Sequence, residues 1–139
     1  MVMQKVVIDS DVIIDHFRIG SDIFNRLTLG IDQNTIKVYL PAVVYTEINS
    51  GQDSKNNLKI TKIEELLDSF ELTLADKEIS QKAGFLIRDI RNLKLADAIV
   101  AATTINLNAK LATRNRKDFE GIKNLKFFKL HKTKTRLDT

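Results

Sequence analysis

Two aspartates in this sequence stand in surroundings where a carboxylate is costly. Asp9 follows directly on the apolar run of residues 6–8, and Asp97 interrupts the apolar run of residues 95–102. Burying a charged group is unfavourable unless the group is paired, hydrogen-bonded or bound to a metal ion. One isolated acid of this kind is more often a helix cap or a salt-bridge partner, but two of them indicate a shared site.

Three further polar residues can join the two aspartates. Glu47 belongs to a predicted helix, and Asn115 and Asp118 follow a predicted strand. The chain has no cysteine and only two histidines, so these side chains would offer a metal ion oxygen ligands. Such a site suits Mg²⁺ or Mn²⁺ rather than Zn²⁺. Ions of this kind bind phosphates, polarise a phosphoryl oxygen and activate water.

Five apolar segments are typical of strands. Residues 6–8 are apolar without alternation, which indicates a strand buried on both faces of a parallel sheet. The other expected strands are residues 36–40, 72–74, 110–113 and 125–130. Ligands of open α/β sheets bind beyond the carboxyl ends of the strands, and Asp9 is expected at such an end.

Segments with helical spacing separate these strands. We expect Ser10 or Asp11 to cap the first helix, Gly30 to end the second and Pro41 to begin the third. A polar loop over residues 52–57 precedes the fourth helix. The expected inward residues of that helix are Leu58, Ile60, Ile63, Leu66, Leu67 and Phe70.

Two more helices are expected, one capped by Asp76 and one that begins at residue 95 and is apolar around most of its circumference. Strands that alternate with helices predict an α/β fold with a mainly parallel sheet flanked by helices on both faces. We expect a single domain over residues 1–130 and a flexible basic tail over residues 131–139.

Composition and charge narrow the possible classes of protein. No apolar run approaches the roughly 20 residues of a membrane span, and Asp9 and Asp11 interrupt any signal-peptide pattern, so the cytoplasm is expected. The net charge of +4 is uneven. From residue 108 onward ten Lys or Arg residues stand against three acids, an excess of seven, which leaves −3 for the rest. Such a basic region can attract phosphates or form a solvated tail.

Four stretches of the sequence together resemble the PIN-domain ribonucleases, and most closely the VapC-type toxins of type II toxin–antitoxin systems. They occur in the order found in that family and span most of the chain. They are Val7-Ile8-Asp9-Ser10, Thr46-Glu47-Ile48, the run from Leu95 to Ala102, and the run from Ala112 to Ile122. The resemblance implies a five-stranded sheet, an acidic Mg²⁺ or Mn²⁺ pocket, RNA cleavage by water, a homodimer and a small antitoxin protein as partner.

The resemblance also implies roles for individual residues. Asp9 and Asp97 would be the principal metal ligands, and Glu47 would bind the metal directly or through water, or orient the attacking water. Either Asn115 or Asp118 would complete the site, Asp118 counting with the three other acids as catalytic. Ser10 and Thr113 would hydrogen-bond the carboxylates. Asp11 departs from the Asn or Ser usual in the family, and it would cap the first helix or add charge around the metal.

Three arginines are candidates for binding RNA phosphates around the pocket, and they are Arg88, Arg114 and Arg116. Two alternatives to a ribonuclease stay open at the level of sequence. Asp9 and Asp11 also fit a phosphatase of the haloacid dehalogenase type, with Asp9 as the nucleophile and Asp11 as the general acid. The third possibility is a catalytically silent PIN-like scaffold that binds RNA or protein.

Overall fold

A computed structural model describes residues 2–20, 22–51 and 55–129 of the chain. In this part the chain forms one five-stranded sheet in which every pair of neighbouring strands is parallel. The strands lie in the order β3-β2-β1-β4-β5. They are β1 (Gln4–Ile8), β2 (Ile36–Pro41), β3 (Glu71–Thr73), β4 (Lys110–Ala112) and β5 (Lys126–Phe127). The expected α/β fold with a parallel sheet is confirmed.

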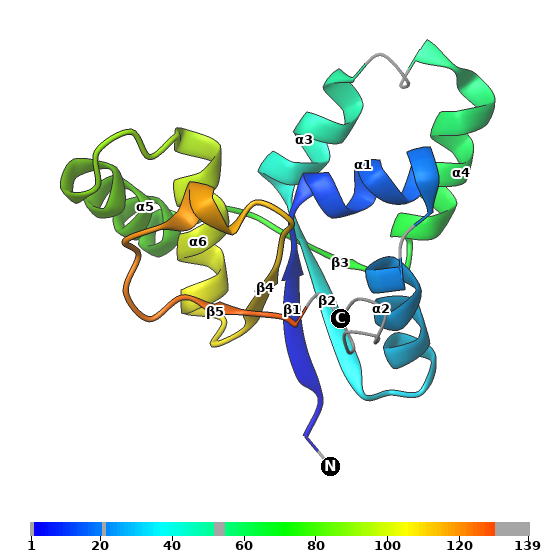
Figure 1. Cartoon of the computed structure of the whole chain (residues 1–139), viewed down its shortest axis with the longest axis horizontal. Helices are drawn as coiled ribbons and strands as arrows, with labels where there is room; N and C mark the ends of the chain where they lie inside the picture. Colours follow the sequence, from blue (N-terminus) through cyan, green and yellow to red (C-terminus); the bar gives the residue numbers. More distant parts are fainter. Residues whose placement is uncertain (1, 21, 52–54, 130–139) are drawn as a thin grey trace, which may run out of the picture.

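Helices cover both faces of this sheet. Figure 1 shows α1 to α4 on one side and α5 and α6 on the other. Their bounds are α1 (Ser10–Ile19), α2 (Asp22–Asp32), α3 (Ala42–Ser50), α4 (Asn57–Leu67), α5 (Lys77–Asp89), α6 (Leu95–Asn106) and the 3₁₀ helix η2 (Arg116–Phe119). Among the described residues no helix is long and apolar enough to cross a membrane.

The centre of the core is β1. Val6, Val7 and Ile8 are fully buried, because helices pack against the sheet from both sides. Val7 lies in register with Tyr39 of β2 on one side and with Leu111 of β4 on the other. The absence of alternation in this run therefore has the expected cause, a strand covered on both faces.

The strand order places a topological switch point next to β1. From β1 the chain moves outward through β2 to β3, and it then returns past β1 to form β4 and β5. The connections on the two sides cover opposite faces of the sheet, so the loops after β1 and β4 diverge (Figure 1). In doubly wound sheets ligands bind in the crevice that opens at such a point, beyond the carboxyl ends of the strands.

Two expected helix boundaries are wrong. Gly30 does not end the second helix, because α2 continues to Asp32. A Cβ atom on Gly30 would lie 2.5 Å from Cδ1 of Ile36, so this residue is small because β2 begins against it. Neither Ser10 nor Asp11 caps α1, since the N-cap is Asp9, whose carboxylate accepts a hydrogen bond from the backbone N–H of Ser10.

Smaller differences concern the elements that follow. Leu58 is 71% exposed, because it lies in the first turn of α4 on the solvent side. The last strand is shorter than expected and covers only Lys126–Phe127. Asp76 caps α5 as expected, accepting a hydrogen bond of 2.9 Å from the backbone N–H of Ile79. The expected tail over residues 131–139 and half of the expected loop (residues 52–54) lie outside the described residues.

Candidate metal centre

Asp9 lies where β1 ends and α1 begins, at the switch point of the sheet. Its backbone N–H continues the sheet by donating to the carbonyl oxygen of Ala112 at 3.0 Å. Its side chain turns back to cap α1, with Oδ1 2.9 Å from the backbone nitrogen of Ser10. The residue is only 8% exposed. A carboxylate is therefore fixed in the crevice by the backbone of the strand and by the helix that follows it.

Thr113 links this carboxylate to the neighbouring strand. It follows β4 directly and is fully buried. Its hydroxyl lies 3.0 Å from Oδ2 of Asp9 and 3.3 Å from Oδ2 of Asp11, and it accepts a hydrogen bond from the backbone N–H of Asn115 at 3.1 Å. Of the two hydroxyl residues expected to bond the carboxylates, Thr113 does so through its side chain and Ser10 through its backbone.

Asp11 holds the loop that follows β4. Its Oδ2 atom accepts hydrogen bonds of 3.0 Å from the backbone N–H of Arg114 and from Nδ2 of Asn115. Its Oδ1 atom is buried and has no hydrogen-bond partner among the described residues. Asp11 thus does not cap the helix, and it adds a second carboxylate beside Asp9.

Asp97 brings a carboxylate from the opposite face of the sheet. It stands in the first turn of α6 and is partly buried. Helix α6 packs against α3, which carries Glu47, and against η2, which carries Asp118. Burial raises the pKa of Asp97, and the charges of Asp118, Glu47 and Asp11 raise this pKa further.

The same mutual repulsion acts on Asp9. Burial raises the pKa of Asp9 to about 7, with the charges of Asp11 and Asp97 adding to the effect and hydrogen bonds from Ser10 and Thr113 opposing it. Burial likewise raises the pKa of Asp11. Carboxylates that repel one another in a cleft are stabilised by a cation, and perturbed pKa values of this kind concentrate at functional sites.

Asn115 and Asp118, the two candidates for the fourth position, have different surroundings. The side-chain amide of Asn115 is bonded to Asp11. Asp118 is exposed on η2, and its charge acts on Asp97. Asp118 and Asp97 therefore line the same pocket, whereas the side-chain amide nitrogen of Asn115 is directed towards Asp11.

The donor set fits a hard divalent cation. All the groups that converge are carboxylates, and one buried oxygen, Oδ1 of Asp11, lacks a protein partner within the described ranges. No three acidic or histidine side chains in this part of the chain are close enough together to enclose an ion. Mg²⁺ does not require such an enclosure, because proteins commonly bind it through one or two carboxylates while it keeps several waters.

The three arginines expected to meet RNA are exposed, and each has a contact within the chain. Arg88 bonds its neighbour Asp89 at 2.8 and 3.0 Å. Arg114 forms an ion pair of 2.8 Å with Asp15. The guanidinium of Arg116 lies 4.7 Å from the centre of the Phe127 ring.

Other basic residues, which the sequence did not single out, line a pocket together with two of the acids. A pocket of about 300 Å³ is lined by Asp97 and Asp118 together with Arg91, Lys94 and Lys117. Their positions in the sequence could have indicated that they lie near the acids. Arg91 and Lys94 immediately precede the run that carries Asp97, and Lys117 immediately precedes Asp118.

Comparison with known proteins agrees with this architecture. Residues 6–125 match the family model of the PIN domain. No curated protein sequence matches. A chain in the structure of VapBC2 from Rickettsia felis bound to a DNA fragment from their promoter superimposes with a TM-score of 0.75 and 21% identity, over 90% of this chain and 98% of that one.

Two other solved structures show the same fold. A chain of the DNA-bound VapBC from Salmonella typhimurium has a TM-score of 0.75 and 16% identity, over 91% of this chain and 98% of that one. A chain of a toxin–antitoxin complex from Klebsiella pneumoniae has a TM-score of 0.68 and 24% identity, over 86% of this chain and 94% of that one. At these identities the likeness is one of fold.

Proposed function

The chain belongs to the PIN-domain family, and from this we propose that it is a divalent-metal-dependent endoribonuclease that acts as the toxin of a toxin–antitoxin pair. PIN domains are generally nucleases, so hydrolysis of a phosphodiester follows from the family. The metal and the RNA substrate are our own inference. The family match argues against the alternative of a phosphatase that uses Asp9 and Asp11.

One observation carries the proposal. Asp9 stands at the end of β1 and Asp97 on α6, and the pKa of each is raised by burial and by the charges of the acids around it. A bound divalent cation would relieve this repulsion, and perturbed pKa values of this kind concentrate at functional sites. Asp9 and Asp97 would hold Mg²⁺ or Mn²⁺, Glu47 would reach it directly or through water, and Asp118 would complete the set.

When bound, the ion would polarise a phosphoryl oxygen and lower the pKa of a water molecule. The residues of the chain supply position and charge. Thr113 keeps Oδ2 of Asp9 in a fixed orientation through a hydrogen bond of 3.0 Å. Asp11 holds the backbone after β4 and so fixes the entry to η2, which carries Asp118. Glu47 lies on α3, from where it would orient the attacking water.

The proposed partners follow from the structural neighbours. The chains that this fold matches were solved in VapBC and toxin–antitoxin complexes. We therefore expect a cognate antitoxin protein that covers the acidic site. A homodimer is part of the same proposal.

The test is cleavage of RNA by the purified protein. We expect cleavage of a labelled RNA in the presence of Mg²⁺ or Mn²⁺ and none in EDTA. Asp9→Asn and Asp97→Asn should each reduce the metal-stimulated rate by at least about a hundredfold while thermal unfolding remains cooperative. Unchanged cleavage in both variants would exclude the proposed site.

The silent-scaffold alternative makes the opposite prediction. A scaffold would bind RNA without cutting it in Mn²⁺, and expression of the Asp9→Ala variant would arrest growth as strongly as expression of the unmodified chain. Relief of growth arrest by Asp9→Ala would instead favour the nuclease. Glu65→Gln serves as a control, because it removes an exposed carboxylate of α4 that does not line the pocket beside the acids.

A further inference from the structure

The pocket beside the acids contains cations that are not held by a hydrogen bond, ion pair or ring contact within the described residues. They are Arg91, Lys94 and Lys117, which line the pocket together with Asp97 and Asp118. The charge of Lys94 lowers the pKa of Asp97, so the cations and the acids share one electrostatic environment. By contrast, the guanidinium groups of Arg88, Arg114 and Arg116 each contact a side chain of the same domain.

The backbone that carries these cations is well fixed. The turn between α5 and α6 is anchored by Leu93, which is 8% exposed, and Asn92 has a positive φ of 68°. On the other wall, η2 is anchored by Phe119, which is 2% exposed. Lys94 immediately precedes α6 and accepts the first helical hydrogen bond, from the N–H of Ala98 at 2.9 Å. The cations therefore project from positions that are set before any ligand binds.

Without a metal ion, the positive and negative side chains that line this pocket are equal in number. Its lining carries three cations and three acids, the third acid being Glu120. A divalent ion held by Asp97 and Asp118 would leave the pocket with a net charge of about +2, by simple addition. A positive pocket adjoining the cleavage site favours a phosphate.

We propose that Arg91, Lys94 and Lys117 form a subsite for a backbone phosphate of the RNA strand, one that neighbours the phosphate cleaved at the acids. This inference rests on the proposed ribonuclease function. Arginine can contact a phosphate through two parallel hydrogen bonds, and the two lysines add point charges. Contacts of this kind position the strand and do not select a base sequence.

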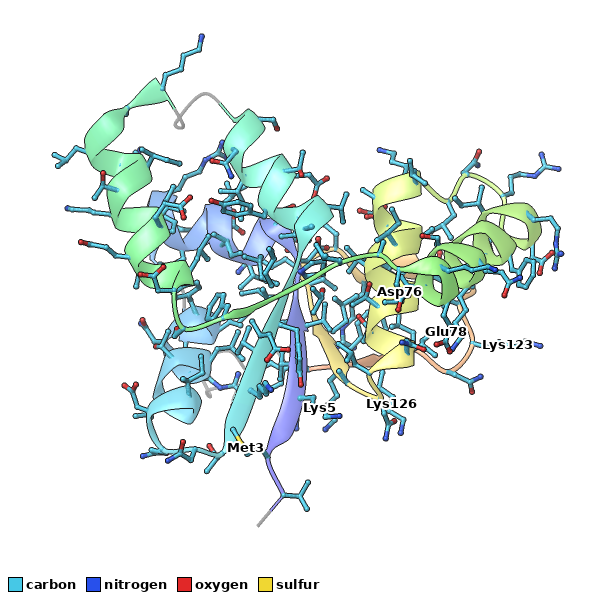
Figure 2. All side chains as sticks on the ribbon, turned by 180° about the vertical axis from the view of Figure 1, so that it is seen from behind. Met3, Lys5, Asp76, Glu78, Lys123 and Lys126 are labelled. Atoms are coloured by element: carbon cyan, nitrogen blue, oxygen red, sulfur yellow. The ribbon has the colours of Figure 1, made fainter. Side chains whose placement is uncertain are left out.

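The test is binding of a labelled single-stranded RNA in the cleavage-deficient Asp9→Asn background, measured over a series of salt concentrations. The pocket variant is R91A/K94A/K117A. The control variant is K62A/K77A/K126A, which removes the same charge from exposed lysines that do not line this pocket. Figure 2 shows Lys126 near Lys5, at the end of the sheet where the strands begin.

We expect the pocket variant to bind RNA at least about tenfold more weakly and the control variant less than about threefold more weakly. Each phosphate contact on a single strand contributes about 0.7 to the slope of log K against log salt concentration, so the slope should fall by about 0.7 or more only in the pocket variant. Equal effects in both triple variants would overturn the subsite. Adenosine monophosphate that binds as tightly as the RNA would also overturn it, because the site would then serve a mononucleotide.

Cleavage by the same triple variants separates this inference from the function. If the otherwise unmodified protein cleaves RNA and the pocket variant keeps its KM, the subsite fails and the ribonuclease function stands. If that protein does not cleave RNA but the pocket variant loses binding, the phosphate subsite stands and the ribonuclease function fails. All six substituted side chains are exposed or line the open pocket, so unchanged thermal unfolding is expected and serves as the check on folding.

Discussion

Oδ2 of Asp11 and Nδ2 of Asn115 lie 3.0 Å apart, joining the first turn of α1 to the loop after β4. This contact uses the amide of Asn115 within the protein. It leaves Asp118, on the next turn of chain, as the acid that faces Asp97. The contacts of their side chains therefore distinguish Asn115 from Asp118 as candidates for the fourth position in the metal site.

We predict that Asp118→Asn weakens binding of Mn²⁺ and that Asn115→Ala does not. Loss of a group that holds or orients a metal ligand lowers affinity by about tenfold or more. Isothermal titration of the metal into each variant measures the difference. Glu120→Gln is the matched control, because it removes the same charge from the same pocket. A larger loss with Asn115→Ala than with Asp118→Asn would assign the fourth position to Asn115.

We predict that the metal-free protein loses stability as the pH rises from about 4 to 7. The pKa of Asp9 is about 7 in the folded chain, against an ordinary value of 3.8 for an aspartate in water. Below pH 3.8 both the folded and the unfolded state carry the proton, so Asp9 has no effect there. Between pH 3.8 and about pH 7, Asp9 is ionised in the unfolded state but keeps its proton in the folded state. This difference favours unfolding by a free energy that grows to about 4 kcal/mol.

Thermal unfolding in EDTA between pH 4 and 8 measures this effect. Asp9→Asn should make the protein more stable than the unmodified chain at pH 7.5 and nearly equal to it at pH 4, since asparagine is also a good N-cap. Added Mn²⁺ should stabilise the unmodified chain more than the variant, because only the chain with Asp9 retains the full donor set. If stability in EDTA did not change with pH, or if it changed equally in the Asp9→Asn variant, the pKa of Asp9 would not be raised in the folded protein.

We predict opposite effects on stability for two glycine substitutions. Gly30→Ala would place a Cβ atom 2.5 Å from Ile36, and overpacking of this kind costs roughly 1–3 kcal/mol. Gly84 lies in α5, is exposed and has nothing within 4 Å of such an atom, so Gly84→Ala should stabilise the protein by up to about 1 kcal/mol. Urea denaturation of both variants measures the difference. A neutral Gly30→Ala would mean that α2 can move away from β2.

The sequence was sufficient for features that depend on local pattern. The unbroken apolar run before Asp9 predicted a strand covered on both faces, and the cap at Asp76 followed from residue type alone. Gly30 shows where local pattern fails. A glycine is typical of a helix end, yet here its size is explained by Ile36, whose approach depends on how α2 packs against β2.

The contacts within the site depend on the order of the strands in the sheet, and this order could not be predicted from the sequence pattern. Asp11 bonds the loop after β4 only because β4 lies beside β1. Among the basic residues, type and distance along the chain did not distinguish Arg88, which is bonded to Asp89, from Arg91, which lines the pocket. That difference arises from the turn between α5 and α6.

The hydrogen bond between Thr113 and Asp9 joins residues from the two ends of the described chain. Asp9 meets this hydroxyl only after β4 has paired with β1, and the two residues are 104 positions apart in the sequence. Contacts between residues so far apart require closure of a long loop, whereas the turns of a helix form locally. A partly folded chain with helices but without the β1–β4 pairing would therefore lack the assembled acidic centre.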